Sequence, residues 1–198
     1  MGGNAGSGKS TFVKALARLG ARTIDADRIG WELLKRGTPT ARQVERAFVP
    51  GILDSRGSID RKKLGAIVFA RPAARLKLNR IVHPALLREI RRQAGQPAPT
   101  PDPSTLTPVT VIDAALLFLW NWHRKVHIAV LISSTRQNKI RRLTAQGLTL
   151  AGARNRLASQ LSEAEMRRMA DLVIPNNGTT AELRTRARRF YRLLQSEL

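Results

Sequence analysis

The sequence predicts an α/β fold in which a parallel sheet is covered by helices on both faces. Short apolar runs with a strand pattern alternate along the 198 residues with longer runs that have helical spacing. A glycine-rich segment of the form G-x-x-x-x-G-K-[ST], at Gly3–Ser10, comes directly before the first helical run. In such sheets ligands bind at the carboxyl ends of the strands, and we expect the functional residues there.

The glycine-rich segment is predicted to be a phosphate-binding loop. Gly3, Gly6 and Gly8 permit backbone angles that a Cβ would forbid, so that successive N–H groups can form an anion-binding nest. The following helix adds its N-terminal dipole. Lys9 would supply a charge to the β- and γ-phosphates, and Ser10 a hydroxyl to Mg²⁺. The alternative is a flexible Gly/Ser-rich tail, which the amphipathic helix directly after the segment disfavours.

The elements follow in order from local signals. Apolar residues of the first helix share one face, and Gly20 ends it. Asp60 is a predicted helix cap, and Pro72 a helix start. Further helices are expected at residues 28–36, 40–48, 61–70, 72–94, 135–146, 150–160, 162–169 and 179–194. Strands are expected at residues 21–27, 109–113, 127–133 and 171–174. Residues 95–108 hold five of the ten prolines and are predicted to form a surface loop.

Composition restricts the function classes. The net charge is +21, and 27 of the 35 basic residues are arginine. That charge would suit a nucleic-acid binder, but aromatic residues make up only 5% and are not interleaved with the basic runs. We therefore expect mostly solvated helix faces, no nucleic-acid partner, and arginines that serve a polyanionic nucleotide.

Targeting and redox features are few. The sequence has no apolar run of 18 residues, so no membrane span is expected. Its first residues lack the pattern of a signal peptide. It has no cysteine, which excludes disulfides and thiolate metal sites. A cytoplasmic location is expected.

Three carboxylates fall at predicted strand ends. Asp25 and Asp27 close the strand after the first helix, on the same side of it, and either could accept a proton from an acceptor hydroxyl. One of them could instead cap the helix expected to begin at Arg28. Asp113 follows alternating apolar residues and could bind Mg²⁺ directly or through water; the alternative is an ordinary strand-end Asp.

Basic residues on the helices after the strand predicted at residues 127–133 could reach the γ-phosphate. Most must be merely solvated. They are Arg136, Lys139, Arg141, Arg142, Arg154 and Arg156. His83, beside Pro84, could contact a substrate phosphate or simply be a helix residue.

Together these motifs resemble the dephospho-coenzyme A kinase family over nearly the whole chain. The specific matches are I-D-A-D-R-I from Ile24, I-V-H-P from Ile81, V-I-D-A-A-L-L-F from Val111 and A-D-L-V-I-x-N from Ala170. Supporting matches are R-G-T-P at 36–39, G-L-T at 147–149 and R-L-A-S-Q at 156–160. The resemblance implies a P-loop kinase three-layer sandwich with a parallel sheet, a helical substrate-binding subdomain at residues 40–94 and a lid at 135–160, within one domain spanning 1–198.

The resemblance also implies roles for individual residues. Asp27 corresponds to the general base for the ribose 3′-hydroxyl, and Arg141 to a lid arginine that contacts ATP. Asn176 lies where the family binds adenine. Acceptor-side residues would be His83, Leu117 and Phe118. The phosphates and Mg²⁺ would be held by Ala5, Gly6, Ser7, Gly8, Lys9, Ser10 and Thr11, with Asp113 as a second metal residue.

Departures from the family pattern are clear at three places. The acid of P-L-L-F-E is replaced by Leu119, and the arginine of R-D-G by Ala145, for which Arg142 could compensate. The apolar strand that should precede the loop is missing. Its absence predicts a gap in the middle of the sheet with unpaired backbone groups, and we expect the natural start to lie further upstream.

The predicted reaction is transfer of the ATP γ-phosphoryl group to the 3′-hydroxyl of dephospho-coenzyme A, with Mg²⁺. One alternative is a nucleoside or nucleotide kinase with another acceptor. The other is a degenerate, non-catalytic paralogue that binds nucleic acid through its charge. The oligomeric state does not follow from the sequence.

Overall fold

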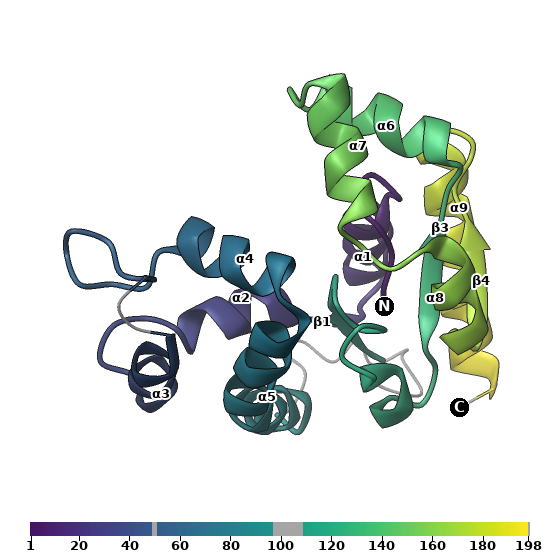
Figure 1. Cartoon of the computed structure of the whole chain (residues 1–198). Helices are drawn as coiled ribbons and strands as arrows, with labels where there is room; N and C mark the ends of the chain where they lie inside the picture. The colour runs from purple at the N-terminus through teal and green to yellow at the C-terminus, as the bar shows by residue number, and fades with distance from the viewer. Residues whose placement is uncertain (49–50, 97–108, 198) are drawn as a thin grey trace. The chain divides into compact units, whose positions relative to one another are not determined.

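The computed structural model describes residues 1–48, 51–96 and 109–197. These residues form two compact units. Unit 1 combines Met1–Ile24 with the described residues from 109 onward, and unit 2 is Asp25–Gln96 (Figure 1). The proline-rich segment at residues 97–108, predicted to be a surface loop, lies outside the described residues, as do residues 49 and 50.

Unit 1 contains four short strands. They are β1 (Arg22–Asp25), β2 (Thr110–Asp113), β3 (Val130–Ser133) and β4 (Leu172–Pro175). β1 pairs with β2, and β3 pairs in parallel with β4 in the register Val130↔Leu172. All four fall within the predicted strand regions or extend one residue beyond them, but most are shorter than expected. The chain passes from unit 1 to unit 2 at the end of β1.

The first two residues join the strand pairs, which corrects the expected gap in the sheet. The Met1 nitrogen donates to the Ile112 carbonyl (2.6 Å), and the Ala114 N–H donates to the Met1 carbonyl (3.2 Å). On the other side Gly2 pairs with β3. Its N–H donates to the Val130 carbonyl (2.9 Å), and its carbonyl accepts from the Ile132 N–H (3.0 Å). Met1 and Gly2 therefore occupy the central position between β2 and β3, where an unpaired strip was predicted.

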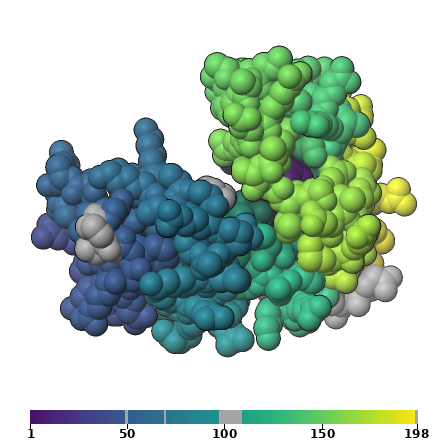
Figure 2. Space-filling model, viewed as in Figure 1, coloured from purple at the N-terminus to yellow at the C-terminus, as the bar shows by residue number. Residues whose placement is uncertain are grey.

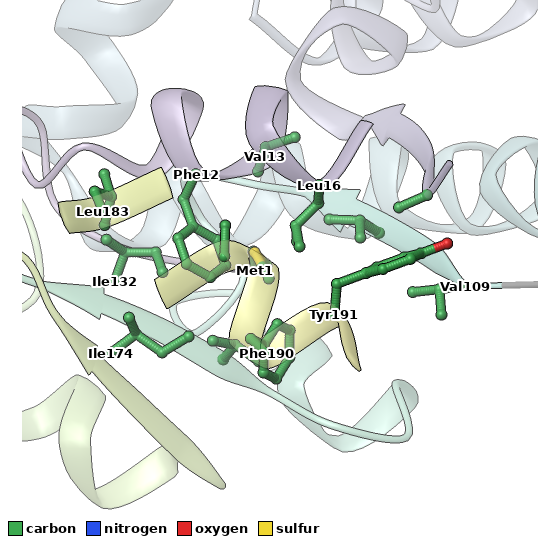
Figure 3. Close-up of a cluster of buried hydrophobic side chains, with 14 residues drawn as sticks. Met1, Phe12, Val13, Leu16, Val109, Ile132, Ile174, Leu183, Phe190 and Tyr191 are labelled. Atoms are coloured by element: carbon green, nitrogen blue, oxygen red, sulfur yellow. The ribbon is translucent and has the colours of Figure 1, made fainter. Parts of the chain in front are cut away.

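One helical layer of unit 1 is formed by α1 (Lys9–Ala17) and α9 (Thr180–Glu197), which contact each other. Their apolar faces surround the buried Met1 side chain beside β3 and β4 (Figure 3). Phe12 of α1 and Phe190 of α9 pack with ring centroids 6.0 Å apart. The predicted apolar face of the first helix is confirmed, since Phe12, Val13 and Leu16 are all buried.

The other face of the sheet carries different elements. Leu131 alternates with Val130 and Ile132 along β3, so it points to the opposite side, where α8 (Glu163–Met169) contacts β3. A short 3₁₀ helix, Trp122–Lys125, follows β2. The helices α6 (Arg136–Ala145) and α7 (Leu150–Ala158) follow β3 in the sequence and come before α8. They pack on each other. Helices on both faces of a parallel sheet confirm the predicted class.

Unit 2 is helical and is organised around α5 (Pro72–Ala94), which contacts the three helices before it. Those helices are α2 (Ala26–Glu32), α3 (Pro39–Phe48) and α4 (Arg61–Ala70). Asp60 caps α4 by accepting from the N–H groups of Lys62 and Lys63, and Pro72 opens α5, both as predicted. The shared contacts bury Val44, Leu64 and Leu86, which are at most 1% exposed.

The junction of β1 and α2 differs from the prediction. The strand ends at Asp25 rather than Asp27, and the helix begins at Ala26 rather than Arg28. Asp25 accepts a hydrogen bond from the Arg28 N–H (2.8 Å) as the helix N-cap, so Asp27 lies in the first turn of α2. The two carboxylates therefore do not share one face of a strand, because the capping bond turns the chain into a helix first.

No helix among residues 1–48, 51–96 and 109–197 combines the length and the apolar character that crossing a bilayer requires.

Candidate functional site

The glycine-rich loop has the backbone of an anion-binding nest. Gly6 and Gly8 have φ angles of 74° and 92°, in the left-handed region that disfavours residues with a Cβ. A Cβ on Gly6 would lie 2.7 Å from the Lys139 carbonyl oxygen, so α6 also leaves no room for a side chain there. Gly8 ends the loop and is the N-cap residue of α1. It has no side chain, so the first turn of the helix receives no side-chain capping bond from it. The first-turn N–H groups of α1 are thus directed at the loop.

Lys9 and Asp113 meet at the centre of the site. The Lys9 ammonium forms an ion pair with the Asp113 carboxylate at the end of β2, and the two side chains are only 12% and 18% exposed. The loop and the strand end are 104 residues apart in sequence. The structure therefore places together two residues that the sequence singled out separately, one for phosphate and one for Mg²⁺.

Asn176 is buried at the end of β4 and holds the loop from the side. Its side-chain amide donates to the Ser7 carbonyl (2.7 Å), and its backbone N–H donates to the Ser133 carbonyl (2.7 Å). The Asn176 side chain is thus bonded to the loop backbone itself, a contact that the predicted adenine-side role did not include. Ser134, the residue after β3, donates to the Asn176 carbonyl (2.7 Å) and completes the link between the two strand ends.

The end of the segment 135–160, predicted to be a lid, and the residue after it contact the loop through groups that sequence reasoning did not assign. The Ala5 N–H donates to the Gln160 side chain (2.9 Å), and the Asn4 side chain donates to the Leu161 carbonyl (3.0 Å). In the space-filling view only a small purple area of the N-terminal segment is visible between α7 and α8 (Figure 2). Gln160 closes the R-L-A-S-Q match, which was its only signal in the sequence.

The two adjacent arginines of α6 behave differently. Arg141, the predicted ATP contact, is exposed. Arg142 is half-buried, and its guanidinium donates to the Gly6 carbonyl of the loop (3.1 Å). Burial, and secondarily the charge of Arg141, holds the pKa of Arg142 below its usual value. The predicted ends of the loop, Ser10 and Thr11, are exposed and half-buried respectively.

A second ionic cluster fixes α6 to α8. The Lys139 ammonium, whose side chain is 8% exposed, donates to the Glu163 carboxylate (2.8 Å). Arg167 donates to the same carboxylate (3.0 Å) and to the Ser133 hydroxyl (3.1 Å). Burial alone would raise the pKa of Glu163, but the bonds and charges of Lys139 and Arg167 outweigh it and lower the pKa. Lys139 thus has a carboxylate partner on α8.

The predicted acceptor-side residues of unit 1 are buried. Leu117 and Phe118 are 0% and 2% exposed. Phe118 packs against His123, with ring centroids 5.9 Å apart, and against the backbone of Gly2. Both side chains therefore belong to the packing behind the central sheet position.

Unit 2 holds the other two predicted residues. Asp27 is half-buried in the first turn of α2. His83 lies within α5, directly before Pro84, and is half-buried. Burial lowers the pKa of His83, so the neutral imidazole is favoured at neutral pH.

Metal binding would rest on few side chains. Within the described ranges, no group of three or more His, Asp, Glu or Cys side chains is arranged to hold a metal ion.

Comparison with known proteins agrees with this geometry. The sequence model of the dephospho-CoA kinase family matches residues 1–182. A dephospho-CoA kinase of Leifsonia xyli is 40% identical over 181 residues, covering 91% of this chain and 89% of the relative. One of Geobacter sulfurreducens is 39% identical over 191 residues, covering 93% and 91%.

Solved structures share the fold. A crystal structure of a Thermus thermophilus protein matches with a TM-score of 0.79 at 26% identity, covering all of this chain and 95% of that one. A dephospho-CoA kinase from Campylobacter jejuni matches with a TM-score of 0.66 at 23% identity, covering 99% and 96%. A shikimate kinase from Acinetobacter baumannii, at 15% identity and a TM-score of 0.53, covers 99% and 91%. The phosphate loop, its Lys9–Asp113 pair and these matches lead to one conclusion: the chain belongs to the dephospho-CoA kinase family.

Proposed function

We infer that the protein transfers the γ-phosphoryl group of ATP to the ribose 3′-hydroxyl of dephospho-CoA, which gives coenzyme A in the last step of its biosynthesis. The observation that carries this inference is the Lys9–Asp113 pair beside the positive-φ turn of the loop, in a chain of this family. The match to the dephospho-CoA kinase family favours this acceptor over those of other phosphate-loop kinases.

The phosphate side of the reaction follows from the loop. Backbone N–H groups of residues 5–11 would bind the phosphates, and Lys9 would exchange its bond to Asp113 for one to the β- and γ-phosphates. Little covalent chemistry is required of the protein in phosphoryl transfer, so most of the rate comes from positioning and from charge stabilisation. Because the Lys9–Asp113 pair is nearly excluded from water, the charge of Lys9 would act strongly on the transferring group.

Mg²⁺ fits the residues present. The Ser10 hydroxyl at the start of α1 and the Asp113 carboxylate at the end of β2 are oxygen donors of the kind that this ion prefers. When bound, the ion would supply positive charge to the oxygens of the transferring group. Asp113, released from Lys9, would then hold the metal at the end of β2.

The acceptor side is assigned to unit 2. We propose that residues 40–94 bind dephospho-CoA and that residues 135–160 form the lid over ATP, with Arg141 reaching its phosphates. Asp27 would accept the proton of the 3′-hydroxyl as general base, and His83 would contact the acceptor. Leu117 and Phe118 would reach the acceptor only after a local rearrangement, because both are buried. Such an enzyme would work in the cytoplasm, where its substrates are made.

An acceptor panel tests the function. The purified protein with ATP and Mg²⁺ should release ADP with dephospho-CoA, and mass spectrometry should find the added phosphate on the ribose. A dephospho-CoA analogue without the 3′-hydroxyl is the matched control and should be inert. Shikimate, adenosine and AMP should support less than about a hundredth of the rate, since a site built to bind a hydroxyl discriminates strongly. Comparable turnover of another acceptor, or salt-sensitive RNA binding without ATP turnover, would support the alternatives instead.

A further inference from the structure

Arg142 joins the three segments that form the phosphate site. Its guanidinium donates to the Gly6 carbonyl of the loop (3.1 Å) and to the Ser134 hydroxyl after β3 (3.2 Å). It also donates to the Asn176 carbonyl after β4 (3.0 Å). Longer contacts reach the carbonyls of Ser7 (3.4 Å) and Gly178 (3.5 Å). Five acceptors around one planar fork suit arginine, whereas the single ammonium of lysine cannot reach them together.

The side of the loop that Arg142 contacts is informative. In a trans peptide the C=O and the N–H point in opposite directions. A cation at the Gly6 and Ser7 carbonyls therefore stands behind the peptide units whose N–H groups belong to Ser7 and Gly8. It polarises the second of these units so that the Gly8 N–H becomes a better donor to an anion on the other side, while the Ser7 N–H is bonded to the Asn4 carbonyl within the loop. It also prevents the carbonyls from turning into the nest.

The charge of Arg142 is available for this role. Within the part of the chain that the structure describes, the acceptors of its guanidinium are neutral oxygens, and none is a carboxylate. Burial lowers its pKa, but an arginine stays protonated at any physiological pH. A half-buried positive charge without a carboxylate partner adds to the potential at the loop. Lys139, one helical turn earlier, is instead bonded to Glu163.

We propose that Arg142 is a positioning residue of the ATP site, which holds the phosphate loop in its binding conformation and ties it to the Asn176–Gly178 turn. This rests on the proposed function. Arg142 does not then substitute for the lid arginine missing at Ala145, because its donors are directed at oxygens of the loop and of the strand ends beside it. It acts before ATP arrives, by preorganising the nest, so it contributes to binding of any nucleotide with a β-phosphate.

Arg142→Lys and Arg142→Met test the proposal, with Arg188→Lys on the exposed face of α9 as the matched control. The first readout is amide hydrogen exchange at Ala5 and Ser7 without added nucleotide, whose N–H groups are bonded to Gln160 and Asn4. Exchange should accelerate about tenfold in both Arg142 variants, which corresponds to losing one charge-assisted hydrogen bond, and stay unchanged in the control. Unchanged exchange in Arg142→Met would overturn the proposal.

The second readout is nucleotide affinity. Kd values for ADP and for ATP should both rise about tenfold in Arg142→Lys, with kcat at saturating ATP within about threefold of the wild type. Selective loss of ATP over ADP, or a lower kcat at unchanged ADP affinity, would mean that Arg142 contacts the γ-phosphate and would overturn the positioning role. If Arg142→Lys kept the nucleotide affinity and the amide exchange of the wild type, the planar guanidinium would not be required, and that part of the proposal would be overturned. A wild type that binds neither nucleotide would refute the proposed function, while the exchange measurement still decides the role of Arg142.

Discussion

The two units differ in the kind of contact that stabilises each of them internally. In unit 1 the functional residues are fixed by polar contacts between distant segments, such as Lys9 with Asp113 and Asn176 with Ser7. In unit 2 the polar contacts are mostly local, such as the cap from Asp25 to the Arg28 N–H, and the bond from Lys77 to the Ala47 carbonyl joins segments only 30 residues apart, around an apolar centre at α5. The difference teaches that the proposed nucleotide site is preformed by tertiary bonding, whereas the proposed acceptor side is a helical body whose candidate residues lie on its individual helices.

The comparison predicts that a change in unit 2 affects the chemistry without affecting the nucleotide. Asp27→Asn should lower kcat by roughly 10²- to 10⁴-fold, because the proposed general base is lost while the side-chain volume is kept. The Kd for ATP and the midpoint of thermal unfolding should stay near wild-type values. Steady-state kinetics and calorimetric titration measure both, and near-normal turnover in a folded protein would remove Asp27 from the mechanism.

A change in unit 1 should act on the nucleotide. Lys9→Met should lower kcat/KM for ATP by roughly 10²- to 10³-fold, as the loss of a charge directed at the reacting group does elsewhere. Binding of dephospho-CoA to unit 2 should change little. Isothermal titration with each substrate separates the two, and equal weakening of both would show that the units do not divide the substrates in this way.

The pairing of Met1 in the sheet predicts a pH dependence for a polypeptide that begins there. Burial, opposed by the nearby Asp113, lowers the pKa of its α-amino group from 8.0 to about 5. Between pH 8 and pH 5 the unfolded chain binds a proton that the folded chain does not, so the free energy of unfolding should fall by roughly 2–3 kcal/mol. Urea unfolding across this range measures it. The N-acetylated polypeptide is the control and should lack this component.

The cluster between α6 and α8 predicts a loss of stability in a lower pH window. Glu163→Gln should lower the free energy of unfolding at pH 7 by about 1–2 kcal/mol, because the buried Lys139 loses its charged partner. The folded pKa of Glu163 is below its ordinary value of 4.5, so the stabilisation is present above that pH and is lost as pH falls below it. The two proteins should therefore converge in stability towards pH 3. A difference that persists there would assign the effect to packing.

The smallest effect is expected in unit 2. The Arg61 guanidinium lies 4.3 Å from the centroid of the Trp31 ring. Arg61→Gln should cost about 0.5–1 kcal/mol, the range for an exposed cation–π contact. Chemical denaturation measures it, with Lys62→Gln on the exposed side of α4 as the control. A cost above that of Glu163→Gln would contradict the view that local contacts in unit 2 contribute less than the long-range contacts of unit 1.

Local features of the fold could be predicted from the sequence, because their causes are local. Asp60 and Pro72 mark helix starts by capping and by backbone geometry, and both helices begin where expected. The error at Asp25 has the same kind of cause. A strand pattern and a capping aspartate compete over the same few residues, and the pattern alone does not reveal that the Arg28 N–H bond prevails.

The candidate site was only partly predictable. Lys9 and Asp113 carry recognisable patterns, and the structure brings them together. The roles of Arg142 and Gln160 depend on which backbone groups of the loop lie beside α6 and the end of α7. Such contacts leave no periodicity in the sequence, and among several arginines on one helix none is distinguished. The pairing of Met1 and Gly2 could not be predicted either, since two residues are too few to show the pattern of a strand.

The central pairing of the sheet has a consequence for the order of folding. Met1 bonds to Ile112, 111 positions along the chain, and Gly2 bonds to β3, which ends at Ser133. During synthesis these first residues leave the ribosome long before either partner strand exists. The closure of such long loops carries an entropic cost that is recovered only once β2 and β3 are in place. This segment, which is made before both of its partner strands, is therefore among the last to reach its native position, and the phosphate loop that follows it directly is completed late as well.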